Sequence, residues 1–309
     1  MTSLQLTQAD TQNKGSLLNY FRERGSEKLN ELKTEIGSNN FKELASELNK
    51  AIGESLSVFR IALLAKAKKE SWKNDDIMRS MLTSTYCAQV AMLDLRNDVW
   101  PYEYMAFSRR IGELWEQFVH IPFDYAVTDA TPFIPPLFEE VRSSLREEIE
   151  VYISELPLAE EQKRELIIYY EKVWLLVDSG EISLQLDLHT EVNGRKLNID
   201  FKSGFGSNEK GNTNRLLMVA TIYKNLGDSY DNVLLVRARE DSNNNYFRTL
   251  KRSSVWQAYC GDEAYEKIGT YTGFGLKDWI QTNIDWPNDL RAETYTHFKS
   301  NNLIKYLEW

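Results

Sequence analysis

The sequence predicts a mixed α/β (α+β) protein in which a helical N-terminal half precedes a mixed sheet flanked by helices. Three observations predict this class. From Ser16 to about Glu181 the apolar residues recur with helical spacing. The period then changes to two over residues 182–192 and 196–203, as in half-buried strands. The Asn-Gly pair between these two segments is a strong signal for a hairpin turn.

The N-terminal half is expected to form six helices after a polar start, residues 1–16, that is expected to fray. Ser16 can cap the first helix, and Gly37 stands where a helix-ending glycine belongs. The second helix begins at Phe41 and has a potential break at Gly53. The remaining expected helices start at Asp75 or Asp76 and then span 103–119, 137–155 and 159–176. The stretch 123–138 is rich in proline and is expected to be loop or extended chain.

Beyond the hairpin, helical spacing returns over residues 211–226. A β-branched run at 232–238 predicts a further strand, and the polar segment Ser242–Tyr246 is expected to be a loop. A helix near 275–284 and another at the C-terminus complete the expected elements.

The composition is ordinary for a globular protein and argues against several classes. Of 309 residues, 42% are hydrophobic and 27% are charged, which is enough for a sizeable core in one large domain or two intimate ones. The sequence has no apolar run of membrane-spanning length and no secretory signal pattern. The two cysteines, Cys87 and Cys260, argue against a disulfide scaffold and a cysteine zinc site. We therefore expect a cytoplasmic protein without a membrane partner.

The hairpin is expected to place two aspartates side by side. With the Asn-Gly pair as a two-residue turn, Asp187 lies opposite Asp200, with Cβ atoms about 4.5–5.5 Å apart. Lys202 lies on the same face, two residues further along the strand. The expected core face carries Leu184, Leu186, Leu188, Leu197, Ile199 and Phe201. The expected polar face carries Ser183, Gln185, Asp187, His189, Asn198, Asp200 and Lys202.

This pair of carboxylates indicates chemistry with a cation. Like charges directly opposite each other destabilise a sheet, so Asp187 and Asp200 need a cation between them or a raised pKa. Lys202 could neutralise one of them, whereas a divalent metal could use both, and oxygen ligands suit Mg²⁺. Metal-assisted hydrolysis of a phosphodiester needs such a site beside a lysine that orients water or stabilises charge. The alternative is an ordinary polar face with surface ion pairs.

At these residues the chain resembles the PD-(D/E)XK nucleases. The order of a strand with Asp187, a hairpin, a strand with Asp200-Phe201-Lys202, a helix and a strand is similar to the core of that family. The next stretch, SGFGSNEKGNTNRL, looks like the turn and helix start that follow the lysine in several type II restriction endonucleases. The resemblance covers about residues 104–240, and Leu186 stands where the family often has a proline.

The resemblance implies roles for single residues. Asp187 and Asp200 would bind Mg²⁺, and Lys202 would be the catalytic lysine. Many such nucleases also place a glutamate on a helix ahead of the core strands. Glu113 and Glu116 are the candidates here, and we favour Glu116. His189, two residues past Asp187, is a possible further metal ligand, although a structural role or a contact with DNA fits it better.

The function implied is that of a sequence-specific, Mg²⁺-dependent endonuclease for double-stranded DNA, most similar to a type II restriction enzyme. Such enzymes usually act as homodimers, because a two-fold protein matches a palindromic site. Residues 1–100 would form a helical region for dimerisation or for clamping DNA. Residues 101–309 would form the nuclease domain, with a helical insertion at 133–177.

A local excess of positive charge supports a nucleic-acid partner. The net charge of −9 disfavours nonspecific coating of nucleic acid, but residues 195–252 contain eleven Lys and Arg against six Asp and Glu. The start of the helix after Lys202 would favour phosphate, and asparagine and arginine in the polar loop could contact bases. The candidate DNA-binding residues are Lys210, Asn212, Asn214, Arg215, Arg237, Arg239, Asn244 and Arg248.

Two alternatives remain open at the level of sequence. One is a repair or phage-defence nuclease with the same core. The other is a non-catalytic helical interaction protein whose hairpin face is merely polar. Divalent-dependent cleavage of DNA distinguishes them, because discrete fragments indicate a restriction enzyme and a smear indicates a nonspecific nuclease.

Overall fold

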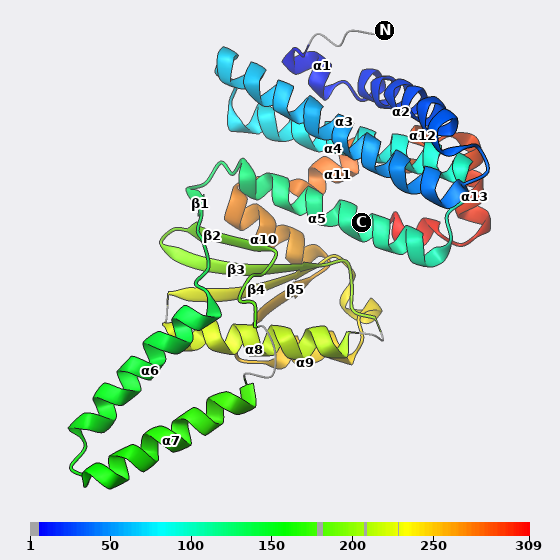
Figure 1. The fold of residues 1–309 in the computed structure, drawn as a ribbon. Helices are drawn as coiled ribbons and strands as arrows, with labels where there is room; N and C mark the ends of the chain where they lie inside the picture. Colours follow the sequence, from blue (N-terminus) through cyan, green and yellow to red (C-terminus); the bar gives the residue numbers. More distant parts are fainter. Residues whose placement is uncertain (1–5, 178–181, 207–208, 228) are drawn as a thin grey trace.

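The computed structural model describes residues 6–177, 182–206, 209–227 and 229–309 (Figure 1). The predicted α+β class is confirmed, because a mixed five-stranded sheet is flanked by helices and preceded by a helical N-terminal layer. The N-terminal helices are α1 (Gln8–Gln12), α2 (Lys14–Ile36), α3 (Phe41–Glu70) and α4 (Asn74–Val99). Within the described residues, no helix is long and apolar enough to cross a membrane.

Packing on α4 organises the N-terminal layer. Helices α2 and α3 pack on it, and nearly every side chain between Met78 and Asn97 is buried. Three expectations about this layer were wrong. Residues 8–12 form α1 instead of fraying, and Asn13, not Ser16, caps α2 through its side chain. Helix α3 also runs unbroken through Gly53, because apolar residues on both sides of the glycine pack as one stripe, and this outweighs its cost of about 1 kcal/mol.

The sheet has the strand order β1-β2-β3-β4-β5, with antiparallel pairs up to β3 and parallel pairs beyond it. The strands are β1 (Ala130–Pro132), β2 (Leu188–Val192), β3 (Arg195–Lys202), β4 (Tyr230–Val236) and β5 (Gln257–Cys260). The predicted hairpin register is confirmed within the strands, since Val192 pairs with Arg195 and Leu188 with Ile199. Both turn residues, Asn193 and Gly194, have positive φ angles, as this turn requires.

The helices of this half cover both faces of the sheet (Figure 1). They are α5 (Tyr104–Asp124), α6 (Phe138–Glu155), α7 (Glu160–Val177), α8 (Lys210–Leu226), α9 (Asn245–Arg252), α10 (Asp262–Thr272), α11 (Leu276–Asn283), α12 (Trp286–Asp289) and α13 (Ala292–Ser300). Two short 3-10 turns lie at Glu240–Ser242 and Ile304–Tyr306. Helices α5 and α10 lie on one side of the sheet and α8 and α9 on the other. The predicted helical insertion is the hairpin of α6 and α7, which projects from the body.

The predicted strand over 182–192 is too long. The chain is in the sheet only from Leu188, because the N–H of Leu186 donates to Nε2 of His189 instead of to a neighbouring strand. Leu184 and Leu186 therefore pack with α8, on the opposite side of the sheet from Leu197, Ile199 and Phe201. The prediction that Leu184 and Leu186 share a core face with the apolar residues of β3 was therefore wrong.

The C-terminal segment returns to the N-terminal helices. Asp289, at the end of α12, accepts a hydrogen bond from Tyr86 on α4 and pairs with Lys14 on α2, both at 2.8 Å. Arg22 pairs with the buried Asp94 at 2.6 Å. One hydrophobic core joins this helical layer to α5, α10 and one face of the sheet. The domain boundary near residue 100 stays a prediction.

Candidate active site

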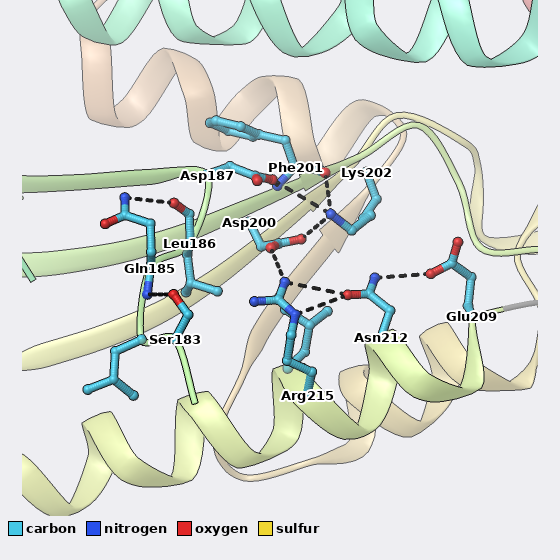
Figure 2. A network of polar contacts seen from close by, with 12 residues as sticks. Ser183, Gln185, Leu186, Asp187, Asp200, Phe201, Lys202, Glu209, Asn212 and Arg215 are labelled. Atoms are coloured by element: carbon cyan, nitrogen blue, oxygen red, sulfur yellow. Dashed lines mark hydrogen bonds and ion pairs between the residues drawn. The ribbon is translucent and has the colours of Figure 1, made fainter. Parts of the chain in front are cut away.

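Asp187, Asp200 and Lys202 lie together at the end of β3, although the predicted cross-strand pair of Asp187 and Asp200 lies just outside the ladder, which begins at Leu188 and Ile199 (Figure 2). Asp200 lies two residues before the end of β3 and has no exposed surface. Asp187 directly precedes β2, and its carboxylate accepts a hydrogen bond from the N–H of Phe201 at 2.7 Å. This bond keeps Asp187 beside β3 although the chain has left the strand pairing there.

Three oxygen atoms surround the ammonium group of Lys202. Its Nζ is 2.5 Å from Oδ1 of Asp200, 3.6 Å from Oδ2 of Asp187 and 3.0 Å from the carbonyl oxygen of Phe201. Burial lowers the pKa of Lys202, but the two carboxylates outweigh this effect and the pKa of the ammonium is raised. The group therefore carries its charge and marks a position where this part of the molecule stabilises a cation.

Asp200 is the most constrained group of the site. Both carboxylate oxygens are buried, and their partners among the described residues are two cations, Lys202 at 2.5 Å from Oδ1 and Arg215 at 3.5 Å from Oδ2. Burial, against the attraction of Lys202, raises the pKa of the Asp200 carboxyl to about 6. A buried carboxylate whose partners are all cations is suited to binding a further cation.

The part of the polar face that lies within the sheet is buried, with His189, Asn198 and Asp200 at most 4% exposed, whereas Ser183, Gln185 and Asp187 before β2 are exposed. Helix α8 covers the buried part with Leu216, Val219 and Tyr223. Arg215 precedes the first of these and reaches from α8 to Asp200, while its guanidinium also contacts the side-chain oxygen of Asn212 at 3.4 Å. The sequence placed Arg215 only on a DNA surface. Its position next to the apolar stripe of α8 is the signal that could have placed it at the carboxylates.

Glu116 approaches the site from α5. Burial and, second, the charge of Asp187 raise the pKa of Glu116. Glu113, the other candidate, instead pairs with Arg109 and Arg110, both at 2.9 Å. The favoured glutamate is thus the one whose charge interacts with the site.

A close helix–strand approach holds α5 in this place. A Cβ atom added at Gly112 would lie 3.3 Å from Oγ of Ser203, the residue that follows β3. The glycine lets α5 run close to the end of the strand. Trp115, one turn further along α5, packs edge-on against Phe201. The element that carries Glu116 is therefore anchored on the strand that carries Asp200 and Lys202.

A buried polar network that the sequence did not reveal supports Asp187. Nε2 of His189 accepts the N–H of Leu186 at 2.9 Å, so its Nδ1 carries the proton that Oδ1 of Asn198 accepts, also at 2.9 Å. Asn198 donates in turn to Asn232 on β4. Burial lowers the pKa of His189, which keeps the ring neutral. His189 therefore positions the segment before Asp187 by a hydrogen bond.

The other candidate DNA-binding residues are spread around α8 and α9. Lys210, Asn214, Arg239 and Arg248 are exposed, and Asn212 bonds Glu209 at the start of α8. Asn244 is not in a free loop, because its side chain caps α9, which begins at Asn245. Arg237 points to the C-terminus, where the carbonyl of Tyr306 accepts its hydrogen bond at 3.1 Å, and burial lowers its pKa to about 10. The structure does not bring Arg237 to the carboxylates.

The residues present fit a single Mg²⁺. Mg²⁺ binds proteins through one or two carboxylates and keeps several waters. Asp187 and Asp200 supply two carboxylates that face one cation position, the one that the ammonium of Lys202 now takes, and both oxygens of Asp200 are buried. Among the described residues there is no group of three or more His, Cys, Asp or Glu side chains that could hold a metal, so a closed protein-only cage is not what this site resembles.

Comparison with known proteins adds no relative. No protein-family model, no curated protein and no solved structure matches the chain. The function is therefore inferred from the geometry of the site and from the resemblance of its motif.

Proposed function

We propose that the protein is a Mg²⁺-dependent endonuclease that hydrolyses phosphodiester bonds of double-stranded DNA, with the sequence specificity of a type II restriction enzyme. One observation carries the proposal. A fully buried aspartate, a second aspartate and a charged lysine meet at the end of β3, in the order of strands, hairpin and helix that resembles the PD-(D/E)XK nucleases. An ordinary surface ion pair would not need a carboxylate without exposed surface, as Asp200 is.

Each residue has a distinct role in this mechanism. Asp187 and Asp200 would hold Mg²⁺, which when bound polarises a phosphate oxygen and lowers the pKa of a bound water. Lys202 orients the attacking water or stabilises the charge that develops on the phosphate. Arg215 places a second positive charge next to Asp200 from the side of α8. The buried setting of Asp200 strengthens these electrostatic interactions, because water screens them less.

The DNA would pass over the start of α8. Lys210 and Asn214 are exposed there, and Asp187 and Arg215 give the carboxylate cluster its opening to solvent, with side chains 35% and 40% exposed. Residues 195–252 carry an excess of five positive charges in a chain of net charge −9, which suits a phosphate backbone. A homodimer would present two such sites to a palindromic sequence.

The deciding experiment is cleavage of a plasmid of known sequence by the purified protein, with Mg²⁺ and with EDTA. Discrete fragments that need Mg²⁺ support a restriction enzyme. A Mg²⁺-dependent smear supports a nonspecific repair or defence nuclease with the same site. The Asp200→Asn variant, purified in the same way, must be inactive, which excludes a contaminating nuclease. Equal absence of cleavage in both preparations would overturn the proposal and favour a non-catalytic interaction protein.

A further inference from the structure

A polar cavity of about 560 Å³ lies between α3, α4 and α5, apart from the aspartate cluster. Its volume falls within the range of about 300–1,000 Å³ that is usual for small-molecule sites. The polar lining residues are Asn49, Lys50, Glu54, Ser57, Arg60, Gln89, Arg110 and Gln117. Apolar side chains that include Ile52, Leu56 and Met92 complete the wall.

Four unmet polar atoms belong to side chains that line this cavity. They are Oδ1 of Asn49, Nε of Arg60, Oε1 of Gln89 and Oε1 of Gln117, all buried and without a hydrogen bond to any residue that the structure describes. Gln89 is the most informative of them, because its residue is only 4% exposed. A buried polar group without a partner costs about 1–3 kcal/mol, so a cluster of four on one cavity points to a bound polar molecule.

The charge of the cavity favours an anion. Its wall contains three cationic side chains and one acid, Glu54. Lys50 pairs with Glu47 at 3.8 Å and Arg110 with Glu113 at 2.9 Å, which leaves Arg60 as the cation without an ion pair among the described residues. Arg60 donates to Oγ1 of Thr85 at 2.5 Å, and its planar set of donors suits a phosphate.

Carboxamides and arginines together match the chemistry of a nucleotide. An Asn or Gln side chain offers one donor and one acceptor, the pattern that pairs with the edge of a nucleobase. Apolar side chains such as Met92 and Leu56 suit the faces of the base. We propose that this cavity binds a nucleotide, with its base at the carboxamides of Asn49, Gln89 and Gln117 and its phosphate at Arg60 and Arg110.

A neighbouring cavity connects this pocket with the α5 side of the aspartate cluster. It measures about 390 Å³ and shares Arg60 and Gln117 with the first cavity. Its other lining residues include Glu113, Glu116, His120 and Asp124, which follow one stripe of α5. The nucleotide can thus come from solution as a free molecule. It can also belong to a DNA strand that reaches the protein near Glu116, in which case the nucleotide would be turned out of the base stack. The strand source rests on the proposed function, whereas the free nucleotide does not.

The test measures both sources with the full chain. Equilibrium dialysis with each ribo- and deoxyribonucleoside 5′-monophosphate tests the free ligand. Duplex DNA with 2-aminopurine, in Ca²⁺ to prevent cutting, tests the strand, because the fluorescence of this base rises when it leaves the stack. We expect one of these signals in the wild-type protein. The Gln89→Leu variant should weaken the binding roughly tenfold without a lower unfolding temperature, because it removes an unmet polar group from a buried site.

A matched pair of arginines controls for charge and folding. Arg109 and Arg110 both pair with Glu113, but only Arg110 lines the cavity. Arg110→Ala should weaken the binding about tenfold and Arg109→Ala should not. Nucleotide binding without any DNA cleavage would leave this proposal standing and overturn the proposed nuclease. If neither probe binds, or if Arg109→Ala and Arg110→Ala act alike, the cavity is merely filled with solvent and the nucleotide proposal is wrong.

Discussion

The ammonium nitrogen of Lys202 lies 2.5 Å from Oδ1 of Asp200, a carboxylate that has no exposed surface. The same nitrogen is 3.6 Å from Asp187. Lysine thus stands between the two acids that a divalent cation would share. A metal ion held by both carboxylates would therefore have to displace the ammonium of Lys202 from this position. This relationship ties metal binding and the position of Lys202 to each other.

Replacing either aspartate should abolish cleavage but not binding. Asp187→Asn and Asp200→Asn remove a carboxylate that Mg²⁺ needs, and we expect the rate to fall about a thousandfold. DNA affinity, measured in Ca²⁺, should stay within a few-fold of wild type. Asp231→Asn is the control, because Asp231 lies on the next strand and pairs with Arg195 instead. Near wild-type cleavage by Asp200→Asn would place the catalytic site elsewhere.

Lys202 should affect the rate of DNA cleavage but not the binding of the metal ion. We expect Lys202→Ala to lower cleavage about 10²–10³-fold, the usual loss when one group that stabilises developing charge is removed. Binding of Mn²⁺ should be retained or tightened, since the ammonium no longer competes for Asp200. Lys196→Ala, on the same strand but packed over the rings of Phe133 and Tyr230, is the matched control. An undiminished rate in Lys202→Ala would reassign the lysine to a structural ion pair.

The stability of the metal-free protein should reveal the strain at Asp200. Burial raises the pKa of Asp200 to about 6, whereas an unfolded aspartate titrates near about 3.9. The folded state therefore holds the proton more tightly, and the contribution of this carboxyl is present below about pH 4 and lost as the pH rises through about 6. In EDTA, Asp200→Asn should gain stability relative to wild type as the pH is raised from about 4 to about 8.

Urea unfolding at the two pH values checks this expectation. Asp231→Asn, which removes a partly exposed ion pair, should not show the same pH-dependent gain. If Asp200→Asn is the less stable protein at about pH 8, the ion pair with Lys202 outweighs the cost of burial.

Binding of DNA should depend steeply on salt despite the acidic net charge. Lys210 is exposed at the start of α8 and forms no ion pair within the described chain, so Lys210→Ala should weaken binding to all sequences alike. The slope of log affinity against log salt should become shallower by about 0.9 for the lost phosphate contact. Arg215 is a poorer probe, because it also contacts Asp200. Arg248→Ala should instead change the preference among sequences, if α9 enters the major groove. A salt-insensitive affinity would argue against the nucleic-acid interface.

Two helical glycines should respond to alanine in opposite directions. A Cβ atom at Gly53 meets no atom within 4 Å, so Gly53→Ala should stabilise α3 by about 0.5–1 kcal/mol. At Gly25 on α2 the same Cβ would collide with the side chain of Leu95, and Gly25→Ala should destabilise the protein. Thermal unfolding of both variants measures the difference. Equal effects would contradict the packing of α2 on α4.

The sequence predicts the hairpin and its aspartates because both depend on local rules. The Asn-Gly turn sets the register, and the register sets which residues face each other. Alternation of apolar and polar residues was misleading over 182–187, where Leu184 and Leu186 serve a different core from the one expected. Alternation cannot reveal that a segment has exchanged its strand pairing for a bond to His189.

The sequence does not predict the burial of the site, for a different reason. Which face of the hairpin α8 covers depends on the crossover between β3 and β4, which no local pattern specifies. The sequence therefore predicts which residues share the polar face, but it does not predict that α8 buries Asp200. The contact between Arg215 and Asp200 follows from the same crossover.

The return of the C-terminal segment has a consequence for the order of folding. Asp289 supplies the partner of Lys14 and Tyr86, and the backbone N–H of Arg291 donates to the buried Asp94 at 2.9 Å. The first helices described here thus close around residues that lie as many as 275 positions further along the chain. Contacts so distant along the sequence slow folding and leave apolar surface open in the meantime. During synthesis these helices would stay partly assembled until the segment around Asp289 has been made.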